Sequence, residues 1–266
     1  MLAAGAGDRL GYASTRPPPK ILLRFGGKSL LQYHIEILKQ LGINELVLGV
    51  GYRHQDIERE IAALGAQHFV RTVFNKDYLQ GSIVTLWTLR DELRGTGTVL
   101  LMDADVLYGG DLLARLVHSR SQNCLLIDRK FDPGDEPVKV CVRDGKIIEF
   151  RKWLSTDFDF CGESVGFFKL SAAVARKIIL QTELYLRMDR RFEPYEETIR
   201  DVLLTSSHDT FGFEDITDMP WTEIDFAADI EHANRRILPS IVKMLPHDST
   251  ATMPRREIEQ AESVNL

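Results

Sequence analysis

The sequence lacks any apolar run that reaches the ~18 residues of a membrane-spanning helix, so we expect no membrane insertion. Positive charge is also scarce, because 33 lysines and arginines stand against 39 aspartates and glutamates, a net charge of −6. The lysines and arginines do not cluster into a basic stripe, and a protein that binds nucleic acid usually has such a stripe. We therefore expect small molecules, and not nucleic acid, as the binding partners.

Cysteine and histidine are too sparse and scattered for several kinds of site. Cys124, Cys141 and Cys161 have no paired spacing, and the seven histidines show no metal-ligand spacing. A disulfide framework, a zinc site and Ser-His-Asp or Cys-His catalysis are therefore not expected. Because no secretory signal precedes the first glycines, we expect a cytoplasmic protein with reduced thiols.

The 266 residues, 44% of them apolar, are enough to bury one sizeable core. Strand and helix patterns alternate through the first half, which predicts a parallel, doubly wound sheet with ligands at the carboxyl ends of its strands. The predicted strands are residues 46–50, 69–74, 99–102, 124–127, 138–142, 146–150, 165–170 and 211–216, and the predicted helices are residues 30–41, 56–64, 83–93, 112–117, 172–180, 196–204 and 226–237. We expect one domain over residues 1–245 and a disordered tail over residues 246–266.

The chain opens on a glycine-rich loop, residues 2–10, with the sequence LAAGAGDRL. Small side chains let backbone N–H groups approach an anion closely, and glycine adopts the positive-φ turns that this requires. Arg9 and, after a proline cluster, Lys20 add two positive charges. This combination predicts a polyphosphate site, although a tight turn with an unrelated lysine is the alternative. The spacing differs from the Walker A and dinucleotide fingerprints, which argues against an ATPase or a dehydrogenase.

The loop resembles that of the nucleotidyltransferases that make nucleotide-sugars and CDP-alcohols, L-A-A-G-x-G-x-R-L followed by P-K. The resemblance covers about residues 2–240 and implies a GT-A-like fold: a single-domain, Rossmann-like α/β/α sandwich with a mostly parallel mixed sheet. It implies that Arg9 and Lys20 are catalytic. The residues implied to bind the nucleotide here are Leu2, Ala3, Ala4, Gly5 and Gly7. Because apolar residues precede this loop in the family, we expect most of the first strand to lie upstream of Met1; a short first strand in a less stable protein is the alternative.

Two carboxylates follow the predicted strand at residues 99–102, where an open α/β sheet places its ligand. The resemblance implies that Asp105 holds Mg²⁺ and that Asp103 faces the nucleotide or a structural partner. A late acidic segment implies Asp225 as the second metal ligand, with Glu223 as the next candidate; capping of the final helix is the alternative for Asp225. Mg²⁺ prefers one or two carboxylates together with phosphate oxygens and water.

The segment at residues 75–86 resembles that of phosphocholine cytidylyltransferases, which implies CTP as the nucleotide. Asn75, Gly81 and Ser82 are then expected near the nucleobase, although Gly81-Ser82 could simply cap a helix. An ionised phosphate or phosphonate acceptor would attack the α-phosphorus and release pyrophosphate. Because such a nucleophile needs no catalytic base, catalysis would consist mainly of positioning and charge stabilisation.

Candidate acceptor-binding residues lie in the second half of the chain. Two lysines are candidates to meet the acceptor phosphate, and aromatic and acidic residues suit a cationic amine. For each lysine, the alternative is a solvated surface position. For each glutamate, the alternative is a position that the helix dipole favours in the first turn of a helix. The candidates are Lys139, Lys152, Trp153, Glu163, Glu193, Tyr195 and Glu196.

Together these features predict a Mg²⁺-dependent cytidylyltransferase, a monomer or homodimer. It would transfer CMP from CTP to a small phospho- or phosphono-alcohol or amine, such as phosphocholine or 2-aminoethylphosphonate. Alternatives are an inositol-phosphate or sugar-1-phosphate nucleotidylyltransferase, a metal-dependent glycosyltransferase and a nucleotide-binding protein without activity.

Overall fold

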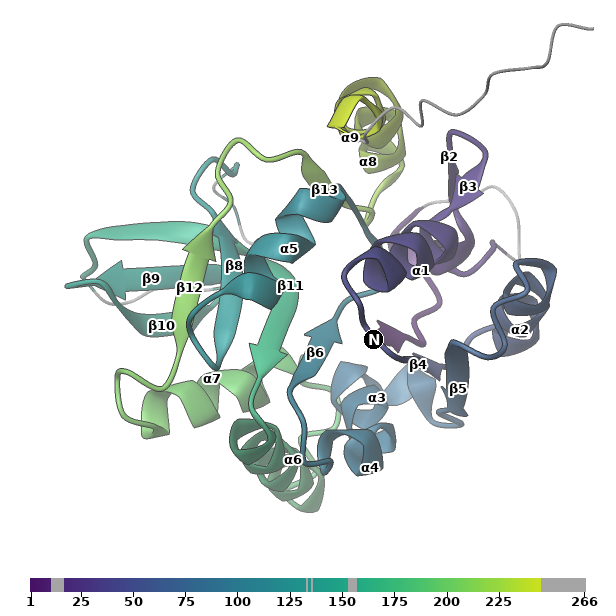
Figure 1. Cartoon of the computed structure of the whole chain (residues 1–266). Helices are drawn as coiled ribbons and strands as arrows, with labels where there is room; N and C mark the ends of the chain where they lie inside the picture. The colour runs from purple at the N-terminus through teal and green to yellow at the C-terminus, as the bar shows by residue number, and fades with distance from the viewer. Residues whose placement is uncertain (11–16, 133, 135, 153–156, 245–266) are drawn as a thin grey trace, which may run out of the picture.

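A computed structural model of the protein describes residues 1–10, 17–132, 134, 136–152 and 157–244. It shows an α/β fold in which helices cover both faces of a mixed sheet (Figure 1). No helix in these ranges is long and apolar enough to cross a membrane. The predicted tail, residues 246–266, lies outside them, so the domain boundary at residue 245 stays a prediction.

The N-terminal part of the sheet is parallel, as predicted. Its strands lie in the order β1 (Leu2–Ala3), β4 (Leu46–Val50) and β5 (Val70–Phe74). Helices α1 (Leu30–Gln40) and α2 (His54–Ala63) connect them. Ser29 begins α1, because its hydroxyl accepts a hydrogen bond from a backbone N–H in the first turn. The short β1 also bridges in parallel to Asp103, and Figure 1 shows the N-terminus beside β4 and β6.

The rest of the sheet is mainly antiparallel, so the expectation of a mostly parallel sheet holds only for the N-terminal half. Strand β11 (Phe160–Leu170) runs antiparallel to β6 (Val99–Met102), β8 (Cys124–Asp128) and β9 (Lys139–Arg143). The described chain between β8 and β11 contains no helix, and parallel pairing would need a long crossover connection. The predicted hairpin joins β9 to β10 (Lys146–Arg151), and β12 (Gly212–Asp215) pairs parallel to β8.

Alternate side chains of the central strands enter two hydrophobic cores, one on each face of the sheet. Phe167 of β11 packs in the core that includes α1 and α5 (Gly110–His118), whereas Phe168 packs in the core that includes α6 (Ala172–Arg187) and α7 (Glu196–Thr205). This alternation follows from the two-residue period of a strand. The layers are therefore helix, sheet, helix.

Several short elements complete the chain, and they show where the predicted bounds differ. The predicted helix at residues 83–93 divides at Leu89 into α3 (Ser82–Thr88) and α4 (Arg90–Leu93). In place of the predicted helix at residues 226–237, the chain forms α8 (Ala227–His232), the π-helix Ala233–Ile237 and α9 (Leu238–Met244). Strands β7 (Val106–Tyr108) and β13 (Trp221–Glu223), which were not predicted, pair with each other. The remaining elements are the short helices Asp8–Leu10, Lys20–Leu22 and Tyr78–Gln80 and the strands β2 (Arg24–Phe25) and β3 (Lys28–Ser29).

Candidate active site

A cavity of about 470 Å³ lies at the carboxyl ends of β1 and β6. The glycine-rich loop, the start of α3, β11 and the start of α7 surround it. This location is the one expected for a ligand site in an open α/β sheet. The predicted site residues that line it are Leu2, Ala4, Gly5, Arg9, Gly81, Ser82, Asp103, Asp105, Lys152, Glu163, Tyr195, Glu196 and Asp225, while Ala3, Gly7 and Lys20 line an adjoining cavity.

Three carboxylates converge at one end of the cavity. Oxygen atoms of Asp105, Glu223 and Asp225 all lie within 4.8 Å of one another. The pairing of β13 with β7 produces this arrangement, because it places Glu223 opposite Val106 and lets Ile224 N–H donate to the Asp105 carbonyl over 2.9 Å. Asp225 does not cap the final helix, whose N-cap is Phe226.

The donor set suits a divalent cation. The Glu223 side chain is exposed, yet desolvation and then the like charges of Asp105 and Asp225 raise its pKa well above the usual range. A bound divalent cation would relieve that repulsion, and carboxylate oxygens are the ligands that Mg²⁺ prefers. These three residues are therefore the candidate metal ligands among the described residues.

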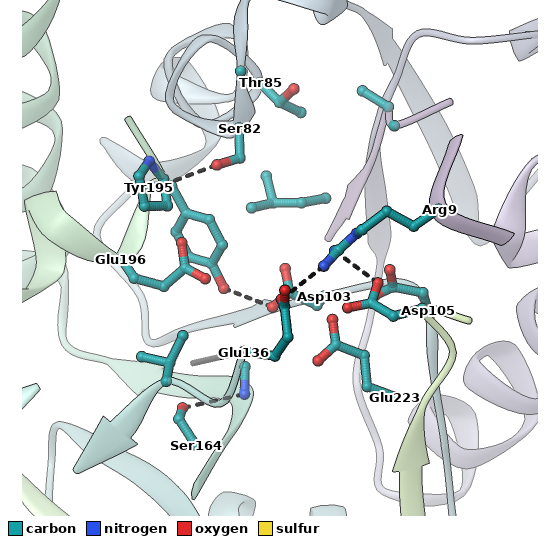
Figure 2. Close-up of a pocket in the computed structure, with 18 of the residues that line it drawn as sticks. Arg9, Ser82, Thr85, Asp103, Asp105, Glu136, Ser164, Tyr195, Glu196 and Glu223 are labelled. Carbon is teal, nitrogen blue, oxygen red and sulfur yellow. Dashed lines mark hydrogen bonds and ion pairs between the residues drawn. The ribbon is translucent and has the colours of Figure 1, made fainter. Parts of the chain in front are cut away.

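Both predicted cations contact Asp225, and Figure 2 shows Arg9 extending into the cavity. Lys20 Nζ lies 2.8 Å from Asp105 Oδ2 and 2.5 Å from Asp225 Oδ1. Arg9 donates to Asp225 over 2.8 Å and to Glu136 over 3.0 Å. Desolvation lowers the pKa of Lys20, but Asp105 and Asp225 outweigh that effect and raise it above its ordinary value. Positive charge is thus concentrated where a polyphosphate would meet the carboxylates.

The glycine-rich loop makes room for one of these cations. Gly7 has a φ of +70°, and a Cβ there would lie 3.3 Å from Lys20 Cγ. A larger residue would therefore be strained and would crowd the lysine stem. The position of Gly7 is thus explained by backbone conformation and by close approach to Lys20.

Two of the residues expected near the nucleobase, Gly81 and Ser82, line the cavity at the start of α3. Gly81 has a φ of +121°, and a Cβ there would lie 2.6 Å from the Arg191 carbonyl oxygen. Gly81 occupies the N-cap position of α3, which was the alternative for this pair of residues. The Ser82 hydroxyl does not cap the helix, because Ser82 Oγ accepts a hydrogen bond from Tyr195 N–H over 2.9 Å and so connects α3 to the segment before α7. Asn75 does not line the cavity: it is buried and donates to Thr85 Oγ1 over 3.0 Å. Asn75 therefore contacts the cavity only indirectly, through Thr85 of α3.

Asp103 has a structural partner, which was one of its two expected roles. Tyr195 Oη donates to Asp103 Oδ2 over 2.9 Å, as Figure 2 shows. Burial, and then the charges of Glu196 and Asp105, raise the pKa of Asp103 well above its usual range, although the bond from Tyr195 opposes the shift. Tyr195, expected to present an aromatic face to the acceptor, instead holds this carboxyl in place.

Of the two lysines expected at the acceptor, only Lys152 lines the cavity, where its Nζ lies 3.3 Å from Glu136. Lys139 is buried and turns away, donating to the carbonyls of Gly134 (2.5 Å) and Lys152 (2.8 Å). A buried ammonium group needs such hydrogen-bond acceptors. Lys139 therefore holds the backbone at Lys152 in place and does not itself face the cavity.

Of the acidic candidates for acceptor binding, two line the cavity and one does not. Glu193 pairs with Arg190 over 3.0 Å and does not line the cavity. Glu163 and Glu196 do line it, and burial raises the pKa of each carboxyl to about 7. Trp153 lies outside the described residues.

Some cavity residues were not named as ligand-binding candidates from the sequence. Glu136 belongs to the connection between β8 and β9, and Ser164 and Val165 lie in the middle of β11, in a segment that resembles the family's acceptor-side strand. Only the antiparallel pairing of β11 with β6 and β8 brings these segments to the end of the N-terminal sheet. The other cavity residues that were not named as ligand-binding candidates are Ala6, Tyr78, Leu79, Thr85, Val138, Gly166 and Pro194.

Comparison with known proteins places this geometry among the nucleotidyltransferases. The chain is 24% identical over 250 residues to the CTP:phosphoglutamine cytidylyltransferase of Campylobacter jejuni, covering 87% of this chain and 96% of that protein. It is 35% identical over 106 residues to the choline-phosphate cytidylyltransferase of Streptococcus pneumoniae, covering 40% and 43% of the two chains.

A similar fold is seen in a solved structure. The inositol-1-phosphate CTP transferase from T. maritima superposes with a TM-score of 0.72 at 21% identity, covering 92% of this chain and 96% of that one. At this level of identity the similarity concerns the fold. The model of the MobA-like NTP transferase domain matches residues 1–155, which is more than half of the chain and includes the glycine-rich loop, Lys20 and Asp105. The chain therefore belongs to the MobA-like NTP transferase family.

Proposed function

We propose that the protein is a Mg²⁺-dependent cytidylyltransferase that transfers CMP from CTP to a small phosphorylated or phosphonate acceptor and releases pyrophosphate. The observation that carries this proposal is the convergence of Asp105, Glu223 and Asp225 opposite Lys20 and Arg9 at the glycine-rich loop. Carboxylates suited to a metal beside fixed cations match the needs of a nucleoside triphosphate.

The proposed reaction is a single in-line displacement. An oxygen of the acceptor phosphate or phosphonate attacks the α-phosphorus, and the bond to the bridging oxygen of the β-phosphate breaks. Pyrophosphate leaves with that electron pair. Lys20 and Arg9 stabilise the negative charge that grows on the leaving group, and Mg²⁺, when bound, supplies further positive charge to the phosphate oxygens.

Lys152 is proposed to hold the acceptor's phosphate or phosphonate group. Its ammonium lines the cavity, and its nearest anionic partner is the exposed Glu136, which a phosphate can replace. Because that group is already largely ionised at pH 7, its oxygen can attack without a catalytic base. The roles of the protein are then positioning and charge stabilisation.

CTP is the proposed nucleotide for two reasons. The names of both relatives and of the solved structure refer to CTP or to cytidylyl transfer. The segment at residues 75–86, which suggested CTP from the sequence, also forms the wall that carries Gly81 and Ser82. Similarity in fold to the T. maritima enzyme keeps an inositol-phosphate acceptor as the second candidate.

The test is pyrophosphate release from CTP, UTP, GTP, ATP and dTTP, each with a panel of phosphate and phosphonate acceptors and Mg²⁺. We expect release with CTP to exceed release with the other nucleotides, and Lys20→Ala protein to serve as the inactive control. A preference for UTP or dTTP would place the protein among sugar-nucleotide enzymes. No release from any pairing would overturn the proposal.

A further inference from the structure

Glu196, at the first position of α7, carries a carboxylate oxygen with no partner. Its Oε2 atom is buried and accepts no hydrogen bond within the part of the chain that the structure describes. The residue lines the main cavity, and Figure 2 shows its carboxyl group directed toward the space beside Tyr195 and Asp103. Buried polar groups are almost always hydrogen-bonded, so this oxygen is an acceptor available to a ligand.

The surroundings of Glu196 favour a positively charged ligand. Asp103 and Glu163 line the same cavity, while Lys152 is the cation that acts most on the Glu196 carboxyl group. If Lys152 binds the acceptor's phosphate, its charge is compensated by that phosphate. The ionised form of Glu196 then needs a counter-charge of its own, which a neutral hydroxyl group cannot supply.

We propose that Glu196 binds a primary ammonium group at the end of the acceptor remote from its phosphate or phosphonate. This inference rests on the proposed function and narrows its acceptor class to aminoalkyl phosphates and phosphonates. A primary ammonium offers both positive charge and N–H donors for the Oε2 atom. A trimethylammonium group offers the charge but no N–H donor, and an uncharged polyol offers only donors.

The described aromatic residues of the cavity fit this choice. A quaternary ammonium is usually held against aromatic faces. Among the described cavity residues the aromatic side chains are Tyr78 and Tyr195. Tyr195 is only 2% exposed and its hydroxyl is bonded to Asp103, while Tyr78 packs over Gly51 on the side of the start of α3. Glu196 is therefore the side chain that would contact the end of the acceptor remote from its phosphate or phosphonate group.

The experiment compares three acceptors of equal length: phosphoethanolamine, phosphocholine and 2-hydroxyethyl phosphate. Pyrophosphate release is measured at saturating CTP and Mg²⁺. We expect kcat/KM for phosphoethanolamine to exceed that of the other two by about tenfold or more, the scale of one charged hydrogen bond. Equal or better turnover of phosphocholine or of the hydroxyl compound would overturn the inference.

Variants of α7 test the assignment to Glu196. Glu196→Gln should raise the KM for phosphoethanolamine about tenfold, remove the preference among the three acceptors and leave the KM for CTP unchanged. Glu197→Gln is the matched control: it removes a charge from the same helical turn, but its carboxylate faces Arg151 over 3.7 Å and does not line the cavity. Equal effects of the two variants would assign the change to the helix terminus and refute the role of Glu196.

A binding measurement separates this inference from the proposed function. Calorimetric titration with phosphoethanolamine, in the presence of Mg²⁺ and a non-hydrolysable CTP analogue, reports the ammonium site without turnover. If no acceptor yields pyrophosphate but phosphoethanolamine binds at least tenfold more weakly to Glu196→Gln protein, the proposed function fails and the ammonium site stands. Binding that is the same in both proteins refutes the site.

Discussion

Gly166 and Asp103 are in such close contact that no other residue fits at position 166. A Cβ there would lie 2.1 Å from Asp103 Oδ2, and Gly166 has a φ of +76°, a conformation that other residues rarely adopt. The same oxygen accepts the hydrogen bond from Tyr195, and Asp103 N–H donates to the Gly166 carbonyl over 3.2 Å. Asp103 thus links β6, β11 and the start of α7 beside the candidate metal ligands.

The first prediction concerns this contact. Gly166→Ala should lower the free energy of unfolding by about 2 kcal/mol or more, because it combines positive-φ strain with a clash. The corresponding loss in melting temperature is roughly 4–8 °C for a chain of this size. Gly97→Ala is the control, because a Cβ at Gly97 meets nothing within 4 Å. Equal melting temperatures for the two variants, measured by thermal denaturation, would contradict the prediction.

The second prediction concerns Lys20, whose ammonium lies between Asp105 and Asp225. Lys20→Ala should lower kcat by ~100-fold or more, the scale of one preorganised electrostatic contact to a transition state. Steady-state pyrophosphate release measures the effect. Lys28→Ala, which removes an ion pair with Glu36 away from the cavity, should turn over at the wild-type rate. Near-wild-type turnover of Lys20→Ala protein would exclude the proposed role.

The third prediction concerns the metal. Asp105→Asn and Asp225→Asn should each abolish Mg²⁺-dependent turnover while the fold is retained, and chelation of Mg²⁺ should do the same in the wild type. Circular dichroism checks the fold, and activity is measured across a Mg²⁺ titration. Asp218→Asn, which alters an exposed pair with Lys130, is the control. If either Asp105→Asn or Asp225→Asn protein keeps full activity at limiting Mg²⁺, the substituted residue is not a metal ligand.

The fourth prediction concerns pH and Glu163. Burial, and then Asp128, raise the pKa of Glu163 to about 7, whereas an unfolded glutamate titrates near ~4.3. Because the folded state holds this proton more tightly, Glu163 makes the protein less stable as pH rises from ~4.3 to about 7. Glu163→Gln should therefore raise the melting temperature at pH 8, with the gain fading toward pH 5. The same difference in melting temperature at every pH would contradict this cause.

Much of the fold was predictable because its signals are local. The helix at α1 and the strand at β4 follow from side-chain periodicity, and Asp144-Gly145 forms the predicted hairpin with φ of 50° and 72°. The prediction of a mostly parallel sheet was wrong for the second half of the chain. Strand periodicity shows which residues form a strand but not the direction of its neighbour, and β11 pairs antiparallel with three strands.

The candidate site shows the same division between local and long-range information. Of the expected acceptor residues, Lys139 and Glu193 turned out to contact other parts of the protein. Sequence shows that a charged residue is present but not which way it points, because a lysine in a strand can face either a cavity or a buried carbonyl. Tyr195 likewise could not be assigned to Asp103, 92 positions away, without the fold.

The sequence by itself determined the glycine-rich loop, its two cations and the aspartates after β6, because their chemistry depends on residue type and short spacing. Tertiary structure decided which carboxylates meet them. Glu223 joins Asp105 only because β13 pairs with β7, and the buried oxygen of Glu196 faces the cavity only because α7 begins beside it. Such contacts join residues far apart in the chain, and they depend on how the strands and helices pack.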